Sequence, residues 1–169
     1  MDSLPPLILT LRLSEEAFTF FNTLRQTYFP PERNFLSAHL TLFHHLPAGE
    51  SRIVEDLAEL AQQQQQIRLQ TVAVVSIGKG VAYKIESAHL VRLHKELQIK
   101  WQQWLTPQDK QKLWPHITVQ NKVSPAVAQQ TLSVLMNSFQ PFEAIGTGFD
   151  LWRYDGGPWS FLQYFPFKT

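Results

Sequence analysis

A four-residue pattern occurs twice in this chain and constrains its fold more than any other feature. It reads His-Leu-Thr-Leu at residues 39–42 and His-Ile-Thr-Val at residues 116–119. In an extended strand, side chains two residues apart point to the same face. Each copy therefore presents a histidine and a threonine together, while its aliphatic side chains turn to the other face. Two such strands predict two equivalent walls of one site.

The segments around the two copies match in order and spacing. A helix pattern that opens at a serine, Ser14 or Ser87, precedes each copy, and a second helix pattern and a hairpin follow it. The hairpin glycines Gly80 and Gly157 each lie 41 residues after the histidine of their copy, and the two histidines are 77 residues apart. We interpret this as an internal duplication. It predicts one two-lobed domain over residues 1–169, with the lobes related by a pseudo-twofold axis.

Hydrophobic periodicity and turn residues predict the individual elements. Strands are expected at 7–13, 38–46, 67–77, 81–86, 115–123, 142–154 and 159–167, and helices at 14–28, 50–66, 87–104 and 124–139.

Composition excludes several classes of protein. The chain of 169 residues is 44% hydrophobic and carries a net charge of +1, which is typical of a globular protein without a strongly basic surface. It contains no cysteine, so disulfides, thiolate nucleophiles and cysteine-ligated metals are excluded. The apolar segment 7–13 is too short to span a membrane and is interrupted by Arg12. We therefore expect a soluble, cytoplasmic protein.

The duplicated residues suit acid–base chemistry on an anionic centre. An imidazole titrates near pH 6.5, so one histidine can accept a proton while the other donates one. Threonine hydroxyls can donate hydrogen bonds to anionic oxygens. If the lobes bring His39, Thr41, His116 and Thr118 to one groove, a phosphodiester attacked in line is the substrate that fits best. This chemistry needs no metal and no cofactor.

The paired tetrapeptides, with residues 31–38 before the first copy and residues 43–47 after it, resemble the two-histidine phosphoesterase superfamily, also called the 2′-5′ RNA ligase or cyclic phosphodiesterase family. The resemblance implies an α+β bilobal fold with two antiparallel sheets and outer helices around a central groove. It also implies metal-independent opening of a 2′,3′-cyclic phosphate or a related 2′-5′ ester, in which one histidine activates water, the other protonates the departing oxygen, and the threonines hold the phosphate.

The chain departs from the family just after the second copy. Many members carry a basic residue there, commonly arginine, whereas this chain has Gln120, Asn121 and Lys122. We expect Lys122 to share the strand face of His116 and to supply a positive charge, as a point charge without the planar fork of arginine.

Further candidates for substrate binding follow from the expected strand faces. Phe43 and His45 share the face of His39, so Phe43 can stack on a base and His45 can rim the groove, while His44 is expected on the opposite face. A metal site at these histidines is disfavoured, because neighbouring strand residues face opposite ways and we expect no carboxylate near them. The remaining candidates are Lys122, Arg33, Tyr83 and Tyr154.

The function predicted from the sequence is a metal-independent phosphodiesterase that acts on a nucleotide or an RNA end as a monomer. Two alternatives stay open. One is a non-catalytic nucleotide- or RNA-binding module that uses the same groove. The other is a purely structural duplicated domain, in which the two histidines are far apart or inaccessible.

Overall fold

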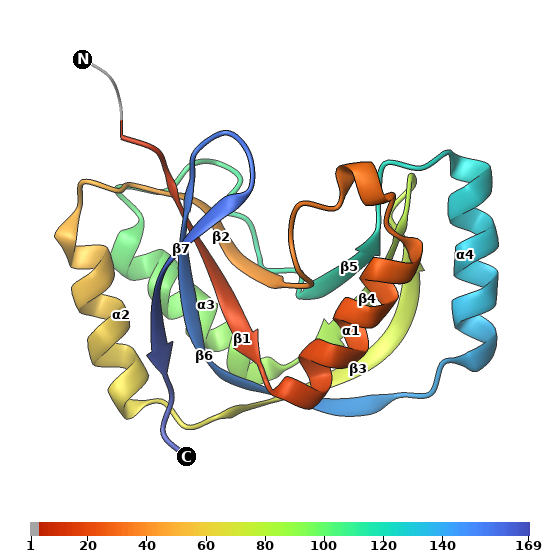
Figure 1. Cartoon of the computed structure of the whole chain (residues 1–169). Helices are drawn as coiled ribbons and strands as arrows, with labels where there is room; N and C mark the ends of the chain where they lie inside the picture. The colour runs from red at the N-terminus through yellow and green to blue at the C-terminus, as the bar shows by residue number, and fades with distance from the viewer. Residues whose placement is uncertain (1–3) are drawn as a thin grey trace.

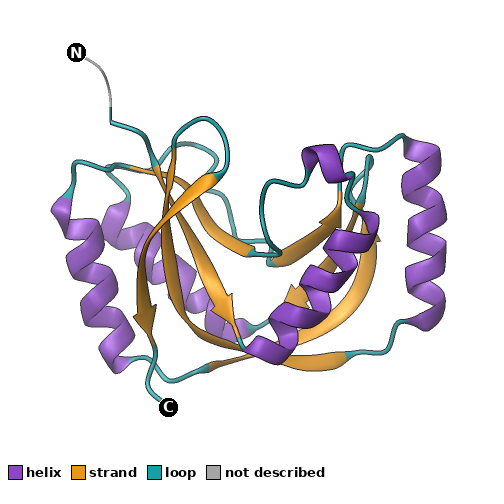
Figure 2. Ribbon diagram, viewed as in Figure 1, coloured by secondary structure: helices purple, strands orange, loops and turns teal. Residues whose placement is uncertain are grey.

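The computed structural model describes residues 4–169 as an α+β fold, in which four α-helices flank one curled antiparallel sheet (Figures 1 and 2). The first three residues of the expected domain 1–169 lie outside the described residues. In chain order the elements are β1 (Leu7–Leu13), α1 (Glu15–Tyr28), the short 3₁₀ helix η1 (Pro31–Arg33), β2 (Leu40–Leu46), α2 (Ser51–Gln63), β3 (Ile67–Ser76), β4 (Val81–Glu86), α3 (Ala88–Trp101), β5 (His116–Gln120), α4 (Pro125–Ser138), β6 (Phe142–Tyr154) and β7 (Trp159–Pro166).

The sheet is continuous because the long strand β6 belongs to both halves. Its strand order is β2-β1-β6-β3-β4-β5, and β7 also pairs with β6. The residues of β6 up to Gly146 pair with β3. From Gly146 onward β6 pairs with β1, and from Gly148 onward it also pairs with β7. The expected α+β class is confirmed, but in place of the two expected sheets there is one sheet, which β6 makes continuous. The curl brings β2 and β5, the strands of the two copies, into contact in the middle of the molecule (Figure 1).

The helices lie at the two ends of the molecule. In Figure 1, α2 and α3 lie beside β1, β2, β6 and β7, and α1 and α4 lie beside β3, β4 and β5. Helix α1 packs against β5, although it comes directly before β2 in the chain. The chain therefore crosses between the halves more than once. The pseudo-twofold relation of the lobes stays a prediction.

Local sequence explains where the helices begin. The side chains of Ser87 and Ser124 accept hydrogen bonds from the backbone nitrogens of Leu90 and Val127, as N-cap residues do. Ser14 occupies the N-cap position of α1, but its side chain makes no capping hydrogen bond. Acidic residues in the first turn of α1 favour that helix end through the helix dipole instead.

No helix within residues 4–169 is long and apolar enough to cross a bilayer.

Candidate functional site

The histidines of the two copies are held by the same contact. His39 lies one residue before β2, and its Nδ1 is 2.7 Å from the carbonyl oxygen of Ser37. His116 begins β5, and its Nδ1 is 2.8 Å from the carbonyl oxygen of Trp114. A carbonyl oxygen only accepts hydrogen bonds, so Nδ1 carries the hydrogen in both rings. Nε2 of each ring is therefore the atom left for chemistry.

A tryptophan packs against each of these imidazoles. The ring of Trp114 is stacked on His116, with 4.1 Å between the ring centroids. The ring of Trp159, at the start of β7, lies 4.8 Å from that of His39. Each ring is thus fixed by a hydrogen bond on one edge and by an aromatic neighbour, which limits the directions that Nε2 can take.

Burial lowers the pKa of both imidazoles, because the charged ring loses hydration. The pKa of His39 falls to about 4, mainly through burial and against the hydrogen bond to its carbonyl partner. The positive charge of Arg25 lowers it further, as would a proton on His116 or His44. The pKa of His116 is lowered by burial first and then by the charge of His44. In the free protein at neutral pH, both rings are neutral and Nε2 carries a lone pair.

Thr41 and Thr118 follow their histidines on the same faces. Thr41 pairs with Thr10 of β1, and Thr118 pairs with Ala82 of β4. Both threonine side chains are half-buried. The structure therefore presents each threonine beside its histidine, as the alternation of strand side chains predicts.

Arg25 of α1 connects the two copies and was missed by the sequence reasoning. Its Nη1 donates to the carbonyl oxygen of Thr118 at 3.1 Å, and its Nε donates to Oδ1 of Asn34 at 2.9 Å, in the segment before His39. The side chain is buried, and burial lowers its pKa to about 10. The sequence contained a signal, because Arg25 follows the buried Phe21 by four residues and so lies on the buried helix face.

A cavity of about 730 Å³ borders His39. It lies between the face of β1, β6 and β7 and the start of α1 with the segment that precedes His39. Arg12 crosses this region, paired with Asp150 at 2.8 Å and placed 3.6 Å over the ring of Tyr164. The aromatic residues that line the cavity are Phe18, Phe35, Trp152, Trp159 and Tyr164.

The structure corrects the expected position of Phe43. Strand β2 has a bulge: Thr41 pairs with Thr10, but Phe43 pairs with Leu9, so Leu42 is an extra residue in the ladder. The side chains of Leu42 and Phe43 are both buried as a result. Phe43 packs into the core, away from the face of His39 and Thr41, and cannot stack on a substrate.

Tyr83 is also in the core. It pairs with Ile117 on the face opposite His116, is 2% exposed, and packs against Phe20 and Phe21 of α1. Burial raises its pKa to about 12. The residue of β4 that pairs with His116 is Lys84, so Lys84 and not Tyr83 is the neighbour of the second copy.

Lys122 does not share the face of His116. Strand β5 ends at Gln120, and the ladder is shifted by one residue between Thr118 and Gln120, which reverses the alternation. Lys122 is exposed in a turn with φ of 63°. The positive charge expected beyond the second copy, that of Lys122, therefore does not lie beside His116.

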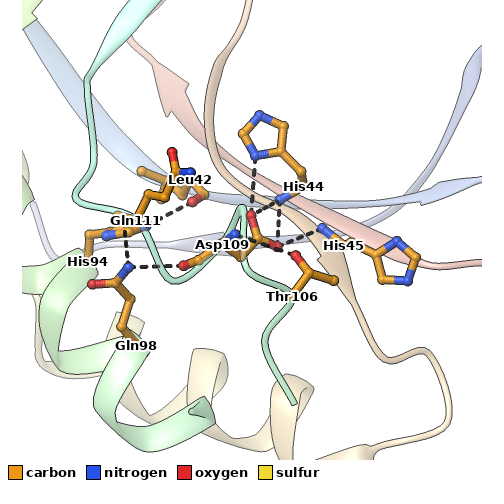
Figure 3. Close-up of polar contacts among 8 residues, drawn as sticks. All are labelled: Leu42, His44, His45, His94, Gln98, Thr106, Asp109 and Gln111. Carbon is orange, nitrogen blue, oxygen red and sulfur yellow. Dashed lines mark hydrogen bonds and ion pairs between the residues drawn. The ribbon is translucent and has the colours of Figure 1, made fainter. Parts of the chain in front are cut away.

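The bulge in β2 also changes the face expected for His44. After Phe43 turns into the core, the next side chain, His44, returns to the side of His39. The rings of His44 and His45 point away from each other (Figure 3). A proton on His44 would lower the pKa of both His39 and His116.

The two remaining candidates lie away from the cavity beside His39. Arg33 is exposed on η1, and Tyr154 is exposed at the end of β6, where it pairs with Trp159. Within residues 4–169, no three histidine, aspartate or glutamate side chains are grouped so that they could hold a metal ion.

Comparison with known proteins gives a family and a set of similar folds. The family model described as the 2′-5′ RNA ligase superfamily matches residues 13–158. No curated protein matches the chain. Among solved structures, TT0787 of Thermus thermophilus is 19% identical, with a TM-score of 0.65 over 95% of this chain and 97% of that one.

E. coli LigT in its apo form is similarly close in fold. It is 18% identical, with a TM-score of 0.64 over 99% of this chain and 100% of that one. A crystal structure described as a phosphoesterase is also 18% identical, with a TM-score of 0.62 over 98% of this chain and 99% of that one. At these identities the solved structures show the fold, and the family model shows the relationship. The chain belongs to the 2′-5′ RNA ligase superfamily.

Proposed function

We propose that this protein is a metal-independent phosphodiesterase that opens a 2′,3′-cyclic phosphate, or a related 2′-5′ ester, of a nucleotide or RNA end. The observation that carries the proposal is the matched pair of imidazoles. His39 and His116 each donate through Nδ1 to a backbone carbonyl, so that each keeps Nε2 free for proton transfer. A purely structural histidine pair does not require this common arrangement.

The two Nε2 atoms perform opposite proton transfers in the proposed reaction. One neutral ring accepts a proton from water as the water oxygen bonds to phosphorus. The other ring, protonated at Nε2, gives its proton to the ester oxygen as the phosphorus–oxygen bond breaks. Water supplies both the hydroxyl added to phosphorus and the proton that restores the pair, so the step balances without a co-reactant. Thr41 and Thr118 donate hydrogen bonds to the phosphate oxygens that do not react.

The cavity beside His39 supports a nucleoside as the rest of the substrate. Its volume of about 730 Å³ and its aromatic lining suit a base, which can stack on aromatic rings. E. coli LigT, which has the same fold, has been crystallised with 3′-AMP and with phosphate. A nucleotide substrate therefore fits both the cavity and the family.

Turnover of 2′,3′-cyclic nucleotides in the presence of EDTA tests the proposal. We expect hydrolysis by the wild-type protein and a loss of roughly 10²–10⁴-fold in kcat/KM for His39→Ala and for His116→Ala, because each variant lacks one proton-transfer group. His89→Ala is a matched control, since His89 is an exposed imidazole on α3 that contacts Gln64. It should retain wild-type activity.

Two results would contradict the proposal. Hydrolysis that needs a divalent ion would show that the imidazole pair is not sufficient. Binding of cyclic nucleotides and 2′-5′-linked dinucleotides without any product would favour the non-catalytic binding module instead.

A further inference from the structure

Strand β2 carries a third histidine toward the proposed active site. The bulge at Leu42 places the aliphatic and aromatic side chains of residues 42 and 43 in the core, and the following residue, His44, returns to the face of His39 and Thr41. A second irregularity leaves two residues of β2 opposite one of β1 before Leu46 pairs with Leu7. His44 sits between these two irregularities, and its side chain is 48% exposed.

The buried carboxylate of Asp109 holds His44 in this place. Oδ1 of Asp109 accepts from Nδ1 of His44 at 3.2 Å and from the backbone nitrogen of His44 at 2.8 Å, while Oδ2 accepts from the backbone nitrogen of His45 at 2.8 Å (Figure 3). Asp109 is only 3% exposed. Burial alone would raise its pKa, but these hydrogen bonds keep the pKa below the usual range. From the sequence, no carboxylate was expected near these histidines.

Helix α3 supports the same structure from the core side. Nε2 of Gln98 donates to the carbonyl oxygens of Asp109 and Gln111, at 2.9 and 2.7 Å, and so fixes the turn that carries Asp109. Nε2 of His94 donates to the carbonyl oxygen of Leu42, the bulged residue, at 2.9 Å. Both irregularities of β2 are therefore held by hydrogen bonds to buried polar side chains.

The other cations near the proposed active site are engaged or directed elsewhere. Lys122 is turned away, and Arg25 already donates to Asn34 and to the Thr118 carbonyl. Lys84, which pairs with His116, forms an ion pair with Glu86 at 3.6 Å. His44 lies on the face of β2 that carries His39 and Thr41, and β2 contacts β5, the strand of His116. Its Nδ1 is bonded to Asp109, so Nε2 is the edge of the ring that stays free for an anion.

We propose that His44 is a third imidazole of the site, which binds a non-bridging oxygen of the substrate phosphate through Nε2, and that Asp109 is its positioning residue. This inference rests on the proposed function only for the identity of the substrate. It assigns to His44 the place that the missing arginine leaves open.

The hydrogen bond to Asp109 determines how His44 can bind an anion. A carboxylate only accepts, so Nδ1 of His44 carries a hydrogen. Nε2 can then donate to a phosphate oxygen only when the ring is an imidazolium. Phosphate binding therefore requires the imidazolium form of His44, and any neutral ring must take up a proton when phosphate binds. Asp109 is the titratable group in contact with this ring, and the charge of His44 is coupled to those of His39, His116 and His94.

Calorimetric titration of the full chain with inorganic phosphate near pH 6 tests the inference. We expect His44→Gln to weaken binding roughly 10-fold or more, the loss typical of a hydrogen bond to a charged group. His89→Gln, which removes an exposed imidazole from α3, should bind phosphate as the wild-type protein does. Repeating the titration in buffers of different ionisation enthalpy measures proton uptake, which should be smaller in His44→Gln than in the wild type.

Asp109→Asn tests the positioning role. Asparagine can still accept from the backbone nitrogens, but it has no negative charge to hold the imidazolium of His44. We expect weaker phosphate binding and reduced proton uptake, whereas a merely structural role would leave proton uptake per bound phosphate unchanged. If Asp109→Asn does not fold, His44→Gln alone decides, because its half-exposed side chain can be replaced without disturbing the core.

The outcomes separate this inference from the proposed function. Phosphate binding and proton uptake that are unchanged in His44→Gln, or that are lost equally in His45→Gln, would overturn the assignment whether or not cyclic nucleotides are hydrolysed. Absence of phosphate binding by the wild-type protein would overturn it as well. His44-dependent phosphate binding without turnover of any cyclic nucleotide would support His44 and contradict the phosphodiesterase.

Discussion

The low pKa values of His39 and His116 determine the pH at which the proposed pair can work. The reaction needs one ring neutral and the other protonated, so kcat/KM should follow a bell-shaped curve set by the two pKa values of the free enzyme. The pKa of His39 is about 4 and that of His116 is also below its ordinary value. We therefore expect the maximum of kcat/KM to lie below pH 6.5, with a decline at higher pH as the acid ring loses its proton.

Initial rates with a 2′,3′-cyclic nucleotide at low concentration, in EDTA and at constant ionic strength, measure this curve. The profile of kcat should lie at higher pH than that of kcat/KM, because a bound phosphate anion favours the protonated rings. A profile of kcat/KM that keeps rising to about pH 8 would show that no group of lowered pKa acts as the acid.

At the residue scale, the sequence singles out candidate histidines and threonines but not the groups that hold them. His39, Thr41, His116 and Thr118 stand out as candidates because the pattern is repeated and because alternation along a strand is local. The hydrogen bonds of Arg25 and Asp109 join segments far apart in the chain, and no local periodicity encodes them. The one signal in the sequence for these contacts was Arg25 itself, a charged residue on the buried face of α1.

At the scale of the element, the helices and strands could be predicted almost to their ends, whereas strand faces could not. Period-two alternation predicts the face of Thr41 from that of His39, but it fails beyond Leu42 because one extra residue reverses every later face. The same occurs in β5 before Gln120. These irregularities account for the incorrect positions of Phe43, His44 and Lys122. They arise from tertiary contacts, such as that of His94 with the Leu42 carbonyl, and leave no pattern in the sequence.

The pairing of β4 with β5 gives a prediction for two glycines of the β3–β4 hairpin. A Cβ on Gly80 would collide with the backbone carbonyl of Gln120 and lie 2.7 Å from Cα of Asn121, so Gly80→Ala must push β5 away from β4. We expect it to lower the free energy of unfolding by about 3 kcal/mol. Gly78 has φ of 88° but open space around its Cβ position, so Gly78→Ala should cost only about 1 kcal/mol.

Urea denaturation followed by circular dichroism measures both variants. The unfolding midpoint of Gly80→Ala should be the lower one, and its phosphodiesterase activity should fall because His116 begins the displaced strand. Equal midpoints for the two variants would mean that β5 moves aside without cost.

At the scale of the whole molecule, the buried imidazoles couple stability to pH. His94 is 4% exposed and its pKa is lowered, by burial first. Below pH about 6.5 an unfolded chain binds a proton at this residue more readily than the folded one, so stability is complete above that pH and declines as the pH falls. His39 and His116 act in the same direction. We expect the free energy of unfolding to decrease between pH about 6.5 and 5, by at most about 1.4 kcal/mol per pH unit for His94.

Urea midpoints at a series of pH values test this. His94→Gln keeps a donor for the Leu42 carbonyl but removes the titrating ring, so its stability should depend less on pH in this range. His89→Gln, on the exposed side of α3, should keep the wild-type slope. An identical slope in all three proteins would exclude His94 as a source of the dependence.

The curled sheet stops just short of becoming a closed barrel. Were β2 and β5 to pair as the other neighbours do, a ladder of backbone hydrogen bonds would fill the space between them, and each strand would lose its edge. Instead the two edges meet in contact without a ladder, and the histidines lie at that seam. An unpaired edge is usually a liability for association with foreign strands; here it lies where the proposed function places the substrate phosphate.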